Sequence, residues 1–241
     1  MAEREIVRAE RGARTYQLVA NRYPVTPFHF LGVRPAGAPR DRLRQHLHGP
    51  EEIEDMILLL EKLGDPYRVY FNSNRGADLS QSGSSVNHWH FQLFPYPQRG
   101  SPTFHQRRAD TLGMEGGVRI ARIADWPAHH VFVECSFRLL EAAARWLWQR
   151  ILAIHDLNVA YNLELLEPGE GIFRAFLFPR APGPDVEIPG CGALSPNFGG
   201  WELSGDLVIP SNSMMDWIEA HAEDAARITR ERLEVTTRAV P

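Results

Sequence analysis

Two histidines and a glutamine occupy alternate positions of one short segment, as His88, His90 and Gln92. Side chains alternate across a β-strand, so residues two apart lie about 6 to 7 Å from each other on the same face. The residues between and after them are apolar and would form the opposite face: Trp89, Phe91 and Leu93. A buried polar group without a partner costs about 1 to 3 kcal/mol, so we expect the polar face to line a ligand site.

Three interpretations fit this row of polar residues. The histidines could be core residues with satisfied hydrogen bonds, or they could bind a metal ion. Alternatively, a neutral imidazole could attack phosphorus and carry the transferred group as a covalent intermediate. The third polar position is a glutamine, and no carboxylate follows within the next dozen residues, which weakens the metal interpretation.

The segment before the histidines favours phosphate chemistry. Glycine, serine and asparagine dominate residues 72–87, and the backbone N–H groups of such loops bind phosphate oxygens. The residues expected to contact substrate here are Asn72, Ser73, Gly83, Ser84, Ser85 and Asn87.

The histidine segment resembles the His-x-His-x-Gln motif of the galactose-1-phosphate uridylyltransferase branch of the histidine-triad superfamily. Residues 86–92 look most like the motif of GDP-L-galactose and GDP-D-glucose phosphorylases, and residues 172–179 and 201–205 look like two later blocks of those enzymes. Residues 21–31 are similar to the segment that opens the fold in this branch, including diadenosine tetraphosphate phosphorylases. The resemblance covers roughly residues 15–210.

The resemblance implies roles for individual residues. His90 would be the nucleophile, while His88 and the backbone before it would orient His90 or the phosphate. Apart from the resemblance, we expect Arg174, on the matching strand of the second half, to bind phosphate, Asn21 to reach the ribose and Glu202 to orient the substrate. Structural roles for the last three residues stay open.

Gln92 bears on the leaving group because an amide cannot titrate. It can donate a hydrogen bond to a phosphoryl oxygen, but it cannot protonate a poor leaving group. A departing phosphate, with a second pKa of about 6, needs no such proton. We therefore expect a nucleotidyltransferase that acts as a phosphorylase of a nucleoside diphosphate sugar, GDP-hexose-like, with phosphate or a sugar phosphate as acceptor. A nucleotide hydrolase and a non-catalytic nucleotide- or metal-binding protein remain alternatives.

Composition limits the partners. The chain has 241 residues and a net charge of −4, which gives no general affinity for polymeric nucleic acid or an anionic membrane. Its two cysteines, Cys135 and Cys191, lack metal-binding spacing, and we expect neither a metal ion nor a cofactor. The N-terminus lacks the apolar core of a signal peptide, so a cytoplasmic location is expected. A homodimer stays open.

Local patterns predict the elements that carry the site. Strands are predicted over residues 15–20, 28–33, 67–71, 131–133, 159–166 and 172–178. Helices are predicted over residues 41–48, 50–63, 136–155 and 214–233. Pro50 suits the first turn of the second helix and Gly64 its end.

The two halves of the chain resemble each other. Residues 92–95 and 176–179 occupy the same place in each half, which matches His90 with Arg174. We therefore predict an α+β fold of two fused histidine-triad-like modules around an antiparallel sheet, residues 1–105 and 106–241, with only the first catalytic.

Overall fold

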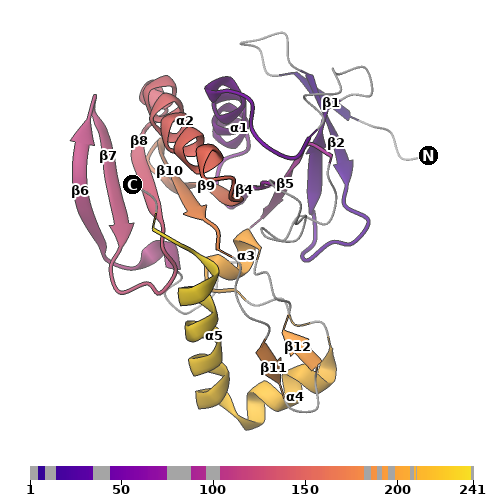
Figure 1. The fold of residues 1–241 in the computed structure, drawn as a ribbon. Helices are drawn as coiled ribbons and strands as arrows, with labels where there is room; N and C mark the ends of the chain where they lie inside the picture. The colour runs from indigo at the N-terminus through magenta and orange to yellow at the C-terminus, as the bar shows by residue number, and fades with distance from the viewer. Residues whose placement is uncertain are drawn as a thin grey trace.

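The protein folds around one antiparallel sheet of ten strands (Figure 1). This computed structural model describes residues 5–8, 15–34, 44–74, 88–95, 104–181, 186–188, 192–194, 199–206, 209 and 211–239. The strands are β1 (Glu5–Arg8), β2 (Thr15–Ala20), β3 (Phe30–Val33), β4 (Tyr67–Asn72), β5 (His90–Pro95), β6 (Ala109–Glu115), β7 (Val118–Ile123), β8 (Val131–Ser136), β9 (Tyr161–Gly169) and β10 (Ile172–Pro179). Their order is β1-β2-β3-β5-β4-β9-β10-β8-β7-β6. A separate hairpin pairs β11 (Val186–Ile188) with β12 (Gly192–Leu194).

Two long helices lie side by side on one face of the sheet (Figure 1). They are α1 (Pro50–Leu63) and α2 (Leu140–Asp156), and their apolar sides share the larger core cluster with the sheet. Three further helices are α3 (Gly200–Leu203), α4 (Asn212–Ala220) and α5 (Ala222–Thr236). Leu203 of α3 and Leu233 of α5 belong to a second cluster, with apolar residues on the other face of the sheet.

The order of elements repeats once along the chain. Each half runs three strands, one helix and two strands: β1, β2, β3, α1, β4, β5 and then β6, β7, β8, α2, β9, β10. The halves meet where β4 pairs with β9, and from there outward the strands follow the same sequence on both sides. The arrangement is therefore α+β, as predicted, and its order supports two modules.

The register of the central strands supports the predicted correspondence between the halves. Pro95 pairs with Tyr67 in the first half, and Pro179 pairs with Tyr161 in the second. Counting back from the two prolines again places Arg174 where the first half has His90. The module boundary near residue 105 remains a prediction.

The helix predicted over residues 41–48 is wrong for residues 44–48, the part of it that the structure describes; these residues form bends and irregular chain. Their polar groups are used elsewhere: the Gln45 side chain binds backbone groups of β4 and β5, and the Leu47 N–H donates to the Tyr161 hydroxyl at 3.1 Å. These residues thus form hydrogen bonds with distant parts of the chain instead of the local backbone hydrogen bonds of a helix.

The single helix predicted over residues 214–233 is two helices. His221, at φ −133° and ψ 46°, breaks the chain between α4 and α5. Ser211 caps α4, because its hydroxyl accepts a hydrogen bond from the Met214 N–H at 3.3 Å.

The hairpin of β6 and β7 was not predicted. Gly116 and Gly117 form its turn at φ 57° and 84°, a backbone conformation that glycine adopts without strain. The predicted strand over residues 28–33 starts later, at Phe30, because Phe28 has φ 59° and cannot continue a ladder. Cys135 is buried, and Cys191 lies outside the described residues. Among the helices that the structure describes, none has the length and apolar character needed to cross a bilayer.

Candidate active site

His90 is the first residue of β5 and lies on the sheet face opposite α1 and α2. Trp89, Phe91 and Leu93 belong to the core cluster under those helices, so alternation turns His90 and Gln92 the other way. The two-faced strand predicted from the sequence is therefore present from His90 onward. His88 precedes the strand and is exposed.

The backbone of His90 is fixed by the side chain of Gln45. The Gln45 Oε1 atom accepts from the His90 N–H at 2.7 Å, and its Nε2 donates to the carbonyl oxygens of His90 at 2.8 Å and Asn72 at 2.9 Å. Gln45 has no exposed surface, so these bonds compete with no solvent. Sequence reasoning missed this residue, which lay in the segment predicted to be helical.

Replacing Gln45 with alanine is expected to lower the free energy of unfolding by about 2 to 4 kcal/mol, because three buried backbone groups lose their partner. Urea denaturation measures this loss. Gln149→Ala, at an exposed position of α2, is the matched control and should change stability by less than about 0.5 kcal/mol. Equal stabilities of the two variants would show that Gln45 does not hold β4 and β5 together.

The imidazole of His90 is oriented for attack through Nε2. Its Nδ1 atom lies 2.8 Å from the carbonyl oxygen of His88, and a carbonyl oxygen only accepts, so Nδ1 carries the proton. Burial lowers the pKa of His90; the hydrogen bond to the His88 backbone opposes this, and the charge of His88 lowers the pKa further. At neutral pH the ring is therefore neutral, with its lone pair on Nε2.

His29 is a site residue that sequence reasoning did not single out. It is buried, directly precedes β3, and makes a hydrogen bond with the Gln92 side chain. Burial lowers its pKa, the bond to Gln92 raises it, and the nearby charge of His90 lowers it. The ring also lies edge-on to Phe94, with centroids 5.0 Å apart. His29 stands within the opening segment that carries the family resemblance, which was the available signal.

Asn21 lies beside His29 and contacts its ring. Its Nδ2 atom is 3.1 Å from His29 Nε2, and its Oδ1 accepts from the Tyr23 N–H at 3.0 Å. The structure thus brings Asn21, His29, Gln92 and His90 to one part of the sheet.

Asn72 and Ser73 lie at the end of β4, next to His90, but are bonded within the protein. The Asn72 Oδ1 atom accepts from Asn162 Nδ2 at 2.7 Å and from the Gly200 N–H at 3.4 Å. Ser73 Oγ accepts from the Tyr161 N–H at 2.7 Å. These contacts tie the two halves together. Gly83, Ser84, Ser85 and Asn87 lie outside the described residues.

Aromatic rings extend the site along β4, β5 and α3. Phe94 stacks on Tyr70 with centroids 5.0 Å apart and contacts Trp201 of α3 at 4.5 Å. A β-carbon at Gly200 would lie 2.8 Å from the Tyr70 ring, so this glycine allows α3 to approach the strand.

A buried carboxylate, Glu164 of β9, anchors the same helix. It accepts from the Tyr70 hydroxyl and the Ser204 hydroxyl at 2.5 Å each, and pairs with His105 Nε2 at 2.7 Å. Burial raises the pKa of Glu164, but the pairing with His105 and the hydrogen bonds from Ser204 and Tyr70 lower it overall. The carboxylate is therefore ionised and holds α3 over the sheet.

Glu202 of α3 lies close enough to the buried Arg180 for its charge to act on that guanidinium. Burial lowers the pKa of Arg180 to about 9, the charge of Glu202 raises it, and the charge of Arg232 lowers it. The predicted contact of Glu202 with substrate stays a prediction.

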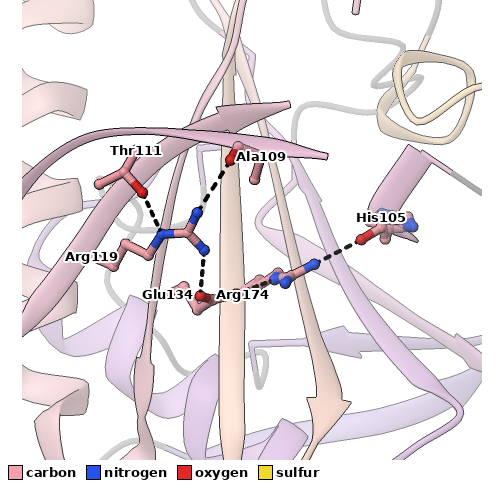
Figure 2. A network of polar contacts seen from close by, with 6 residues as sticks. All are labelled: His105, Ala109, Thr111, Arg119, Glu134 and Arg174. Carbon is pink, nitrogen blue, oxygen red and sulfur yellow. Dashed lines mark hydrogen bonds and ion pairs between the residues drawn. The ribbon is translucent and has the colours of Figure 1, made fainter. Parts of the chain in front are cut away.

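Arg174 is not brought to His90. Three strand spacings across the sheet and four residues along the strand separate Arg174 from His90, about 20 Å at ordinary strand dimensions. Figure 2 shows its guanidinium bound to Glu134 at 2.5 Å and to the His105 carbonyl at 2.7 Å, while Arg119 binds the same carboxylate at 2.7 Å. Burial raises the pKa of Glu134, and the two arginines lower it overall.

This ion-pair network takes the place in the second half that His90 has in the first. A guanidinium is not a nucleophile at neutral pH, and the expectation that only the first half is catalytic stays a prediction. Within the described part of the chain, no group of three or more histidine, cysteine or acidic residues is arranged to bind a metal ion.

Comparison with known proteins shows the fold. No protein-family model and no curated protein sequence matches this chain. The structure of yeast Ap4A phosphorylase Apa2 is similar, with a TM-score of 0.66 at 18% sequence identity over 92% of this chain and 72% of that one. Apa2 in complex with Ap4A gives a TM-score of 0.65 over 92% of this chain and 73% of that one, again at 18% identity. The resemblance to diadenosine tetraphosphate phosphorylases is thereby confirmed at the level of the fold, and this chain has the fold of yeast Ap4A phosphorylase.

Proposed function

We propose that this protein is a nucleotidyltransferase that forms a covalent nucleotidyl intermediate on His90. The observation that carries the proposal is the state of that ring: its Nδ1–H is held by the His88 carbonyl, and the lowered pKa leaves Nε2 unprotonated at neutral pH. Such an imidazole is an activated nucleophile for phosphorus.

In the first step, Nε2 of His90 forms a bond to the α-phosphorus while the bond from phosphorus to the bridging oxygen breaks. The leaving phosphate or sugar phosphate takes that electron pair. The ring becomes cationic, and the His88 carbonyl stabilises the charge through Nδ1–H. In the second step, an acceptor oxygen attacks the same phosphorus and His90 departs as the neutral ring. Gln92 stabilises the phosphoryl oxygens through its amide in both steps.

The substrate that we propose first is a nucleoside diphosphate sugar, with inorganic phosphate or a sugar phosphate as acceptor. The sequence resemblance to GDP-hexose phosphorylases supports this choice. A dinucleoside polyphosphate is the second candidate, because the similar yeast enzyme is a phosphorylase whose structure was determined with Ap4A. Both substrates fit the same step, since each has a phosphorylated leaving group.

The experiment mixes enzyme in excess with substrate radiolabelled at the α-phosphorus, with and without inorganic phosphate. We expect a labelled adduct with GDP-glucose or Ap4A when phosphate is absent, and its rapid loss when phosphate is added. Absence of adduct with GDP-, ADP- and UDP-glucose and with Ap4A would refute nucleotidyl transfer. Adduct that decays equally fast without phosphate would make the protein a hydrolase.

The pH dependence of adduct formation tests the state of His90. Because the pKa of His90 lies below the ordinary value of 6.5, the rate at pH 6.5 should exceed half of its maximum and should fall as the pH drops through the lowered pKa. His88→Ala keeps the carbonyl but removes the neighbouring charge, so the acid limb should move to higher pH. An acid limb that does not move in this variant would show that His88 acts on His90 through its backbone alone.

A further inference from the structure

A cavity of about 430 Å³ lies on the helix-covered face of the second half of the sheet. Its walls come from α2, from strands β6, β7, β8 and β10, and from the residues that follow α5. β7 is five strands away from β5, about 24 Å, and the cavity is on the opposite face from His90. It is therefore separate from the candidate active site, and its volume lies within the range of small-molecule sites.

The cavity is lined by a cluster of positive charge. Arg122 of β7, Arg150 of α2 and Arg238 after α5 line it, against a single carboxylate from Glu115. Three arginines minus one glutamate give a local charge of +2, in a chain whose net charge is −4. The chain as a whole is acidic, but it places three arginine side chains around this one cavity.

Two of these arginines are available to a ligand. Arg122 and Arg238 are exposed and form no ion pair with any residue that the structure describes. The guanidinium of Arg150 lies over the Trp146 ring, 4.9 Å from its centroid. Arg119 and Arg174, on the other face of the sheet, differ because both are bound to Glu134.

The backbone holds Arg238 at the cavity. Its N–H donates to the Pro179 carbonyl at 3.1 Å, and the preceding residue, Thr237, pairs with Arg180. The chain after α5 is therefore fixed beside the end of β10, which keeps Arg238 at the cavity that Arg122 also lines.

His130 lines the cavity with an uncharged imidazole. Its Nδ1 lies 2.8 Å from the Ala128 carbonyl, and its Nε2 accepts from the Ile123 N–H at 2.8 Å. Burial lowers the pKa of His130 to about 4, with the hydrogen bond to Ala128 opposing and the charge of Arg122 adding to the effect. The floor between these polar groups is apolar: Ile120, Val131, Trp146, Ile154 and Leu177.

We propose that this cavity is a second binding site, for an organic phosphate with an apolar or aromatic body. The phosphate would lie between Arg122 and Arg238, where charge-assisted hydrogen bonds to guanidinium are strong. The body would rest on the apolar floor, which removes hydrocarbon surface from water. The site is independent of the chemistry at His90.

The test uses AMP as the probe, adenosine as its uncharged counterpart, and isoleucine-methyl NMR of the whole chain. Ile120 and Ile154 line the cavity, while Ile53 and Ile57 lie in α1 and serve as reporters outside it. We expect AMP to shift the methyl resonances of Ile120 and Ile154 in a saturable way, leaving Ile53 and Ile57 unchanged. Adenosine should need at least tenfold higher concentration. Equal effects of AMP and adenosine, or no shift with AMP, would overturn the proposal.

Variants of the cavity arginines test where the phosphate of AMP binds. Arg122→Gln with Arg238→Gln should weaken the AMP response of Ile120 and Ile154 by about 100-fold, roughly tenfold for each lost charged contact. The control is Arg227→Gln with Arg230→Gln, which removes the same charge from exposed ion pairs on α5. The cavity variant should form the His90 adduct at the normal rate. Shifts that persist unchanged in the cavity variant would place the AMP elsewhere and refute the site.

Discussion

His90→Gln is expected to form no nucleotidyl adduct and to lower turnover by on the order of 10⁴-fold or more, the scale seen when a nucleophile is removed. Glutamine keeps a polar side chain of similar length, but its amide has no lone pair able to bond to phosphorus at neutral pH. The fold should survive, because the backbone bonds from Gln45 to residue 90 do not use the side chain. Single-turnover labelling measures the adduct, and urea denaturation measures stability.

The matched control is His221→Gln, an exposed histidine between α4 and α5 that should leave both adduct and turnover unchanged. Peptide mapping of the wild-type adduct should place the label on His90. Full turnover in His90→Gln, or label on His88, would remove His90 from the role of nucleophile.

Gln92→Ala should slow adduct formation by on the order of 100- to 1000-fold, as expected for loss of one donor to the transferred phosphoryl group. Gln92→Glu should be slower still, because a carboxylate repels the phosphate of the substrate. Both variants also remove the amide that contacts His29, so the pH profile must be recorded with the rate. The measurement is single-turnover labelling with one nucleoside diphosphate sugar.

Gln92→His separates a role in proton transfer from a role in binding. A titrating imidazole can protonate a poor leaving group, so this variant should gain activity toward a nucleoside phosphoramidate relative to the nucleotide sugar. Equal adduct rates for wild type and Gln92→Ala would show that Gln92 does not touch the phosphoryl group, and the inferred leaving-group chemistry would then fail.

Local patterns predicted the parts of this protein that depend on neighbours in the chain. The alternation of polar and apolar residues along β5 predicted that His90 and Gln92 lie on one face of the sheet and Phe91 and Leu93 on the other. Successive side chains of a strand point to opposite faces, so the local pattern is sufficient. Pro50 and Gly64 marked the first and last turns of α1, because each residue restricts or permits a particular backbone angle. The match of the two halves was visible because β5 and β10 end in the same short pattern.

The same local reasoning failed where distant residues decide the conformation. Residues 44–48 have a helical composition, yet their polar groups bind strands that follow far later in the chain. Residues 214–233 show one apolar period, yet the chain turns at His221 between two helices. At residues 44–48 these long-range contacts outweigh helix propensity, which is worth less than about 1 kcal/mol per residue.

Tertiary structure alone decided what surrounds the polar face of β5. Gln45 reaches His90 from 45 residues away, and His29 reaches Gln92 because β3 lies beside β5. Arg174 looked available for phosphate in the sequence, but pairing of β10 with β8 sets Glu134 directly opposite it. Strand order determines which side chains become neighbours, and no local pattern encodes it. The sequence therefore determined which residues could do chemistry, and the order of strands decided which of them meet.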